Sequence, residues 1–314
     1  MEGIGGYFEL ELNKNEEYHQ KAIRLNTGRN AFEYILLANS YSKVYLPFFT
    51  CDVLLEPLKE HQIEYEFYYI DESFEPLFDY NLINENEAFL YTNYFGLKDS
   101  FIVQLVNYCQ NLIVDSAQSF YSKPIDKVDT FYSPRKFFGV PDGAYLYIGK
   151  KLDISFEKDK SFDRCSHLLK RIDCSAEIGY EDFVHNDASL NNQDIKEMSS
   201  LTESLLSTID YKWCAEKRKE NFNFLHHKLQ KTNKLKITLP LIGVPMVYPY
   251  WSDDDRLKQK LLDNKVYTAT YWANVLEWSG EDSLEYQMTK QIIYLPIDQR
   301  YDEIDLKRIV DLLL

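Results

Sequence analysis

The stretch YSPRKFFGVPDG, residues 132–143, places a single lysine, Lys136, in a short turn between an apparent strand and a glycine. A lysine amine becomes a nucleophile when burial or a nearby cation lowers its pKa, and it then forms Schiff bases with carbonyl groups. Ser133 stands three residues earlier, and Gly139 and Gly143 follow, where a missing side chain lets the backbone approach a ligand closely. On its own this pattern is only a weak indication of a lysine with covalent chemistry. The alternative is a solvated turn lysine, because lysines are mostly exposed.

A second candidate is Asp115, at the end of the apolar run NLIVDSAQS. An aspartate that ends a buried strand points into the crevice at the carboxyl ends of the strands. A carboxylate there can pair with the protonated ring nitrogen of pyridoxal phosphate. Gln118, three residues on, can donate a hydrogen bond to the phenolic oxygen of that ring. The alternatives are an N-cap or a metal-binding aspartate for Asp115, and an ordinary loop amide for Gln118.

A third candidate is LNTGRNAF, in which Thr27, Gly28 and Arg29 open a predicted helix. Backbone N–H groups at a helix start bind phosphate, and a threonine hydroxyl and an arginine add donors. The alternative is a simple threonine N-cap. The three candidates are complementary, because they supply a phosphate cradle, a ring partner and a covalent lysine.

Strands that alternate with helices must position these residues. The apolar patterns predict strands within residues 43–49, 63–71, 87–96, 111–119 and 143–151, and helices within 21–40, 52–61 and 100–110. This alternation predicts an α/β fold with a mostly parallel sheet and helices on both faces. Ligands bind such sheets at the carboxyl ends of the strands, which places the following residues near one crevice: Thr27–Arg29, Phe49, Asn93, Asp115 and Gln118.

The second half of the chain is expected to form a smaller α+β unit. Residues 191–231 predict a long helix, broken at most once, on an apolar stripe from Ile195 to Trp213. We therefore expect a large cofactor-binding domain over 1–190, followed by a linking helix and a small C-terminal domain over 191–314. The aromatic segment YWANVLEW, residues 271–278, is expected to serve core or dimer packing. A wall facing a sugar or a base is the alternative.

Composition excludes several classes of function. The formal net charge of −15 argues against a nucleic-acid partner. No run of about 18 apolar residues predicts a membrane span, and the N-terminus lacks the apolar core of an export signal. The five cysteines contain no CxxC pair, which fits free thiols in a reducing cytoplasm better than disulfides or a zinc site. We expect a cytoplasmic protein without a metal site.

The sequence resembles the DegT-type family of sugar aminotransferases, which have the type I pyridoxal-phosphate fold. The resemblance covers most of residues 1–150 and, more loosely, the rest. It rests on these segments: GGYFELEL, LNTGRNAFEYIL, VYLPFFTCDVLLEPL, FLYTNYFG, LIVDSAQS, SPRKFFGVPDGAYL and YLPIDQRYDEIDLKRIVDLL.

The resemblance implies a role for each candidate. Lys136 would form the Schiff base with pyridoxal 5'-phosphate and shuttle protons between the substrate carbon and the cofactor. Asp115 would hold the pyridine nitrogen protonated, and Gln118 would contact the ring oxygen. Gly28 and Arg29 would give backbone N–H groups to the phosphate.

Some positions depart from the family pattern. Phe131 stands where the family usually has a serine five residues before the lysine, and Ser133 is expected to take over that phosphate contact. Cys51 stands where the family often stacks an aromatic ring on the cofactor, and Phe49 or Tyr94 is the expected substitute. The asparagine that the family donates from the neighbouring subunit is not recognisable, and the candidates for it are Asn191 and Asn192.

The activity implied is transfer of an amino group, from glutamate, to a nucleotide-linked keto sugar in surface polysaccharide synthesis, by a homodimer. One alternative is a regulatory protein of the same fold that binds pyridoxal phosphate without turnover. Another is a pyridoxal-phosphate enzyme with a non-sugar substrate. A plain nucleotide-binding α/β protein lacks support, because no GxGxxG fingerprint follows a predicted strand.

Overall fold

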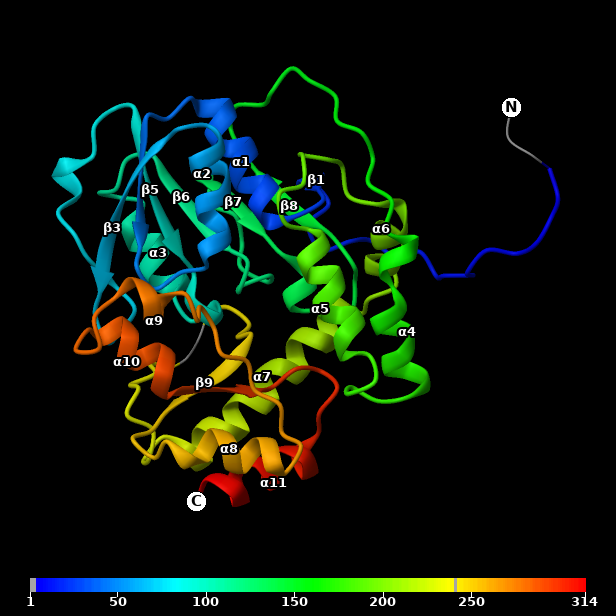
Figure 1. Ribbon diagram of the computed structural model, residues 1–314, viewed down its shortest axis with the longest axis vertical. Coiled ribbons are helices and arrows are strands. Elements are labelled where there is room, and N and C mark those ends of the chain that lie inside the picture. The colour runs from blue at the N-terminus through cyan, green and yellow to red at the C-terminus, as the bar shows by residue number, and fades with distance from the viewer. Residues whose placement is uncertain (1–3, 240–241) are drawn as a thin grey trace.

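The computed structural model describes residues 4–239 and 242–314. Within them, eight strands form the main sheet in the order β1-β8-β7-β6-β5-β2-β3-β4 (Figure 1). Its strands are β1 Ile23–Leu25, β2 Lys43–Pro47, β3 Glu64–Ile70, β4 Pro76–Leu77, β5 Glu87–Thr92, β6 Leu112–Ser116, β7 Asp129–Tyr132 and β8 Ala144–Tyr147. The central pairings, from β3 through β2, β5 and β6 to β7, are parallel, and the pairings at the two edges are antiparallel. The expected α/β fold with a mostly parallel sheet is confirmed.

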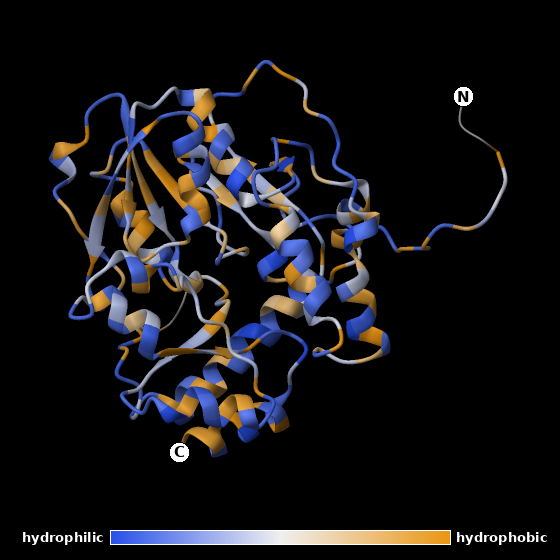
Figure 2. Ribbon diagram, viewed as in Figure 1, coloured by the Kyte–Doolittle hydropathy of each residue, from blue (hydrophilic) through white to orange (hydrophobic). Residues whose placement is uncertain are grey.

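Both faces of this sheet are buried, as the near-continuous apolar runs of its central strands require (Figure 2). On β5, Ala88 and Leu90 pack with helices α1 (Gly28–Asn39) and α2 (Leu55–Glu60). Phe89 and Tyr91 point to the opposite face and pack with α3 (Asp99–Leu105). The two-residue period of a strand therefore decides which face each candidate residue reaches.

The prediction of a long helix over residues 191–231 is wrong for the first part of that range. Residues 191–192 form a turn and residues 193–199 run extended along the sheet, where the N–H of Asn26 donates to the carbonyl of Lys196 (3.0 Å). Helix α6 (Ser200–Leu206) begins only after its N-cap Ser199, and α7 (Tyr211–Leu229) begins after its N-cap Asp210. Two local capping residues thus override a continuous apolar stripe. Trp213, placed on that stripe, is 52% exposed.

Several further elements were not expected from the sequence. Strand β1 lies within residues 21–40, where only a helix is predicted, and it pairs antiparallel with β8 at the edge of the sheet. Helices α4 (Ser166–Asp173) and α5 (Tyr180–Ser189) carry mostly exposed side chains, so they lack the buried stripe that would reveal them.

The C-terminal part is an α+β unit, as expected. The strands β9 (Val247–Trp251) and β10 (Ile292–Pro296) pair antiparallel and pack with α7 in a hydrophobic cluster of their own. The remaining helices are α8 Arg256–Asp263, α9 Val275–Trp278, α10 Leu284–Gln291 and α11 Glu303–Leu313. The division into domains at residue 190 stays a prediction. None of the helices in the described residues is long and apolar enough to cross a bilayer.

His19 anchors the N-terminal segment inside the aromatic core. The side chain is 1% exposed, and its ring centroid lies 4.2 Å from that of Tyr132. Its Nε2 lies 2.7 Å from the carbonyl oxygen of Phe120, and its Nδ1 lies 3.3 Å from the hydroxyl of Tyr147. Burial lowers the pKa of His19 to about 4, so the imidazole is neutral in the folded protein.

Acidification should therefore destabilise the protein through His19. The folded pKa lies below the unfolded value of 6.5, so the stability that this residue contributes is present above 6.5 and is lost as pH falls toward about 4. The loss should reach about 2.5 kcal/mol near pH ~4.5. Urea unfolding of the wild type and of His19→Gln at neutral and acid pH measures it, with the exposed His227→Gln as control. Equal pH dependence of wild type and His19→Gln would contradict the prediction.

Candidate active site

Asp115 lies on β6, one residue before the strand ends, on the face that α1 covers. It lies two residues after Ile113 and so shares the face on which Ile113 packs with α1. Its register neighbours are Thr92 on β5 and Phe131 on β7. The carboxylate is 7% exposed and accepts a hydrogen bond from the N–H of Ala117 (2.8 Å). Burial raises the pKa of Asp115 to about 6, against the opposing effects of the Ala117 N–H and the Lys136 charge. A carboxylate held this way favours a cationic partner.

Lys136 ends the 3-10 turn Pro134–Lys136 that follows β7, and its side chain is exposed. Its Nζ lies 5.8 Å from the ring centroid of Tyr271. Its charge also lowers the pKa of both Asp115 and Cys51, although burial leaves each above its ordinary value. The structure thus brings Lys136, Asp115 and Cys51 together from three separate segments of the chain.

The start of α1 borders the same face. Thr27 is the N-cap, its hydroxyl oxygen accepting from the N–H of Asn30 (3.1 Å) and its proton going to Asn30 Oδ1 (2.6 Å). The first-turn N–H groups of Gly28 and Arg29 have no acceptor within a helix. A Cβ on Gly28 would lie 3.7 Å from the ring of Phe131, the register neighbour of Asp115. The helix start and the aspartate therefore lie at one end of the sheet, and the Thr27 hydroxyl already serves as a cap.

The guanidinium of Arg29 is engaged elsewhere. Its Nε lies 2.9 Å from Glu56 Oε2, its Nη1 donates to the carbonyl of Leu190 (2.6 Å) and its Nη2 donates to Asn191 Oδ1 (3.1 Å). Only the backbone of Arg29 is left to bind a ligand at the helix start. Asn191 is held near that start by its own subunit.

Gln118 and Ser133 complete the predicted set. Gln118 is buried, and its Oε1 accepts from the N–H of Phe95 (3.3 Å), which leaves Nε2 as its free donor. Ser133 precedes the turn of Lys136, is buried and does not cap the turn with its hydroxyl. Asn93, expected in this crevice, lies on the opposite face, where it donates to Asp99 Oδ1 (2.5 Å) on α3 and to Ser122.

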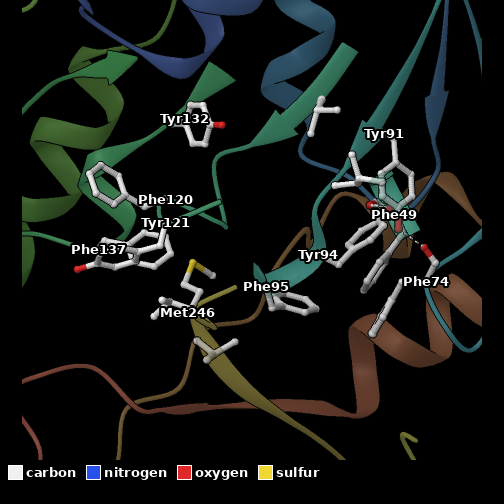
Figure 3. Close-up of a cluster of buried hydrophobic side chains, with 14 of the residues drawn as sticks. Phe49, Phe74, Tyr91, Tyr94, Phe95, Phe120, Tyr121, Tyr132, Phe137 and Met246 are labelled. Atoms are coloured by element: carbon white, nitrogen blue, oxygen red, sulfur yellow. Dashed lines mark hydrogen bonds between the residues drawn. The ribbon is translucent and has the colours of Figure 1, made fainter. Parts of the chain in front are cut away.

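Phe49 and Tyr94 belong to an aromatic cluster (Figure 3). Phe49 is 0% exposed, and its ring centroid lies 4.6 Å from Trp272, 5.7 Å from Tyr94 and 6.1 Å from Phe74. Contact between Phe49 and a cofactor ring would require this cluster to open. Cys51, two residues on, is half-buried and lies within range of the charges of Lys136 and Asp115. Of Phe49, Tyr94 and Cys51, only Cys51 has a pKa affected by the charge of Lys136.

Sequence reasoning did not assign Tyr271 to the site. Tyr271 and Trp272 lie on a loop of the C-terminal unit, and Asn274 fixes this loop by donating to the carbonyl of Thr50 (2.9 Å). Trp272 packs on Phe49, as core packing of the aromatic segment predicts, whereas Tyr271 faces Lys136. Burial raises the pKa of Tyr271 to about 12, so its hydroxyl stays protonated. The aromatic pair is evident in the sequence. Its contact with Lys136 was not predictable, because the two segments are more than a hundred residues apart along the chain.

A group of possible metal ligands lies away from this crevice. Glu33, Glu60 and His61 have ligand atoms within 4.8 Å of one another. Glu33 is already paired with His61 Nε2 (2.9 Å) and accepts from Asn30 Nδ2 (3.0 Å). Hydrogen bonding within the chain accounts for this group.

Comparison with known proteins first gave no sequence match. No protein-family model matches the chain, and no curated protein matches it. Solved structures do match. DesV from S. venezuelae, in complex with a ketimine intermediate, has a TM-score of 0.63 at 14% identity, over 93% of this chain and 83% of its own.

Two further structures agree with that match. A DegT DnrJ EryC1 StrS aminotransferase from Brucella abortus has a TM-score of 0.60 at 14% identity, over 93% of this chain and 84% of its own. Spr1654 from Streptococcus pneumoniae, in its PLP form, has a TM-score of 0.62 at 13% identity, over 94% and 86%. The chain therefore has the fold of these proteins, among them a member of the family that its sequence resembles.

Proposed function

We propose that the protein is a DegT-type aminotransferase that uses pyridoxal phosphate to transfer an amino group, from glutamate, to a nucleotide-linked keto sugar in surface polysaccharide synthesis. The observation that carries this proposal is the convergence of Lys136, Asp115 and the start of α1 at one end of the sheet. Open α/β sheets bind their ligands at the carboxyl ends of the strands, where these groups lie. Matching structures that are aminotransferases support the proposal.

The donor set fits pyridoxal phosphate. The buried carboxylate of Asp115 suits a protonated ring nitrogen, and the free first-turn N–H groups of Gly28 and Arg29 suit a phosphate. The uncommitted hydroxyl of Ser133 adds a donor for the phosphate, and Nε2 of Gln118 adds one for the ring oxygen. The N–H groups, the Ser133 hydroxyl and the Gln118 amide are thus free to donate to the cofactor, and the Asp115 carboxylate has the charge that complements its ring nitrogen.

When bound, the cofactor supplies an electron sink for the charge that develops as the substrate carbon loses its proton. Nζ of Lys136 removes the α-proton of the amino donor and returns a proton to the accepting carbon. Asp115 keeps a proton on the ring nitrogen throughout. The ring of Tyr271, 5.8 Å from Nζ, borders the amine on one side.

The proposal extends to the setting of the enzyme. We propose a cytoplasmic homodimer in which residues 1–190 hold the cofactor and residues 191–314 form the linking and small C-terminal part. The five cysteines, all within the described residues, are free thiols, which suits a reducing compartment. The exposure of Lys136 in a single subunit suits a site that a second copy covers.

An absorption titration with pyridoxal phosphate tests the proposal. We expect a visible band, and after borohydride reduction the label should map to Lys136. Glutamate should bleach the band, and a nucleotide-linked keto sugar should restore it. A band that persists with glutamate supports a regulatory protein that binds pyridoxal phosphate without turnover. Restoration of the band only by a non-sugar keto compound supports an enzyme with a non-sugar substrate. No band, or a label elsewhere, would reject the cofactor.

Restoring an aromatic ring at the cysteine position should tighten cofactor binding. In Cys51→Tyr, a ring replaces the half-buried thiol beside Lys136 and Asp115, and ring stacking contributes about 0.5–1.5 kcal/mol. The dissociation constant for pyridoxal phosphate should fall about 3- to 10-fold. Fluorescence titration measures the change, with the exposed Cys174→Tyr as control. Unchanged or weaker binding in a folded Cys51→Tyr would contradict the placement of Cys51.

A further inference from the structure

Arg218 is a buried cation with no part in the proposed chemistry. It lies near the middle of α7, is 2% exposed and is among the largest fully buried side chains of the protein. Its guanidinium donates to the carbonyl of Phe137 (3.2 Å), the carbonyl of Met246 (3.0 Å) and Oε1 of Gln299 (3.1 Å). None of these acceptors within the described residues is a carboxylate. Burial lowers the pKa of Arg218, and the nearby charge of Asp298 offsets this effect only in part. An apolar side chain would avoid the cost of burying the charge, which points to a positional role for the guanidinium.

The acceptor Phe137 directly follows Lys136. Its carbonyl oxygen receives Nη2 of Arg218 and also Nε2 of Gln299 (3.4 Å), and the guanidinium lies 4.6 Å from the ring centroid of Phe137. Figure 3 shows Phe137 close to Met246, on segments far apart in the sequence. One guanidinium thus ties the end of the lysine turn to α7, to the segment before β9 and to the segment after β10.

The hydrogen bonds of the turn itself are local. Within it, the N–H of Lys136 reaches the carbonyl of Ser133 at 3.4 Å, and the N–H groups of Phe137 and Phe138 both reach the carbonyl of Pro134 at 2.9 Å. At the surface, Arg135 Nη2 lies 2.9 Å from Asp187 Oδ1. The turn is three residues long, and the lysine side chain beyond it is exposed. Without a tether, the amine would sample positions away from Asp115 and Tyr271.

We infer that Arg218 is a positioning residue, which with Gln299 clamps the carbonyl of Phe137 and thereby holds the amine of Lys136 at the site. The kinetic part of this inference rests on the proposed function, and the structural part does not. A misplacement of about 1 Å can cost on the order of 10²-fold in rate. We expect Arg218→Met to lower kcat by roughly that factor and to leave the KM for glutamate within about twofold, with partial rescue by Arg218→Lys.

Trypsin provides a readout that needs no cofactor, because the turn itself contains Arg135 and Lys136. Loss of a charged hydrogen bond should raise the open population of the turn on the order of 10-fold. In cofactor-free protein, cleavage after these two residues should accelerate by that factor in Arg218→Met, relative to cleavage after the exposed Lys151. Gln299→Leu should give about a threefold rise, and Arg256→Met, on the surface of α8, should give none.

The outcomes separate the two ideas. Faster cleavage at the turn in a protein that never binds pyridoxal phosphate would support the clamp and reject the proposed function. An unchanged cleavage ratio in folded Arg218→Met would overturn the clamp, whatever happens to kcat. Should Arg218→Met fail to fold, the same ratio in Gln299→Leu decides, and equality with wild type would overturn the clamp.

Discussion

Replacement of Lys136 by alanine is expected to lower kcat/KM for amino transfer by roughly 10⁴-fold, because in the proposed function this amine is the base that moves the substrate proton. The free energy of unfolding should change by less than about 0.5 kcal/mol, since the side chain is exposed and makes no hydrogen bond or ion pair within the described residues. Steady-state kinetics with glutamate and a keto sugar nucleotide, together with urea unfolding, measure both quantities.

The neighbouring exposed lysine provides the matched control. Lys151→Ala removes the same functional group from the loop after β8, and its activity should equal that of the wild type. A small primary amine added to Lys136→Ala should recover part of the rate, because the missing group is an amine in an open position. Activity within about tenfold of wild type in Lys136→Ala would reject Lys136 as the base.

Replacement of Asp115 by asparagine should make the cofactor-free protein more stable while it removes activity. The folded pKa of about 6 lies above the ordinary value of 3.8, so the contribution of this carboxyl is most favourable below 3.8 and is lost as pH rises through 6. Above that range the buried carboxylate costs about 3 kcal/mol at most, a cost that asparagine avoids. Asparagine also keeps an oxygen for the Ala117 N–H. We expect a gain of about 2 kcal/mol near pH ~8 and none near pH ~4.

Activity should fall on the order of 10²- to 10⁴-fold in Asp115→Asn, because a neutral amide does not keep the ring nitrogen protonated. Urea unfolding at the two pH values and kinetics near pH ~8 test the pair of effects together. Asp311→Asn, at an exposed position on α11, should change neither quantity. Equal stability of Asp115→Asn and wild type at the higher pH would show that the carboxylate carries no burial cost.

The sequence predicted those site residues whose position is set by a single strand or helix. Asp115 ends an apolar run, and Thr27 opens a helix by capping it, so each position follows from its own segment. Contacts between distant segments were not predictable in this way. The loop of Tyr271 reaches Lys136 only because Asn274 binds the carbonyl of Thr50.

Errors in the elements have a similar physical origin. The apolar stripe through residues 191–199 was taken for a helix, yet Ile195 packs beside α1 and Met198 packs on the opposite hydrophobic cluster. Apolar residues that pack into two different hydrophobic clusters can belong to an extended segment as readily as to a helix. Their spacing alone therefore does not distinguish the two structures. Phe49, predicted to contact the cofactor, packs with Phe74 and Trp272 in the core, and its contact with a cofactor stays a prediction.

The aromatic cluster beneath the crevice also gives the protein an optical property. Trp272, one of four tryptophans, lies on Phe49 and directly follows Tyr271, whose ring lies 5.8 Å from the lysine amine. Trp213, by contrast, is on the surface of α7. Light absorbed by Trp272 would pass by resonance transfer to a chromophore bound at Lys136. A fall in tryptophan emission would then report occupancy of the crevice without any label attached to the protein.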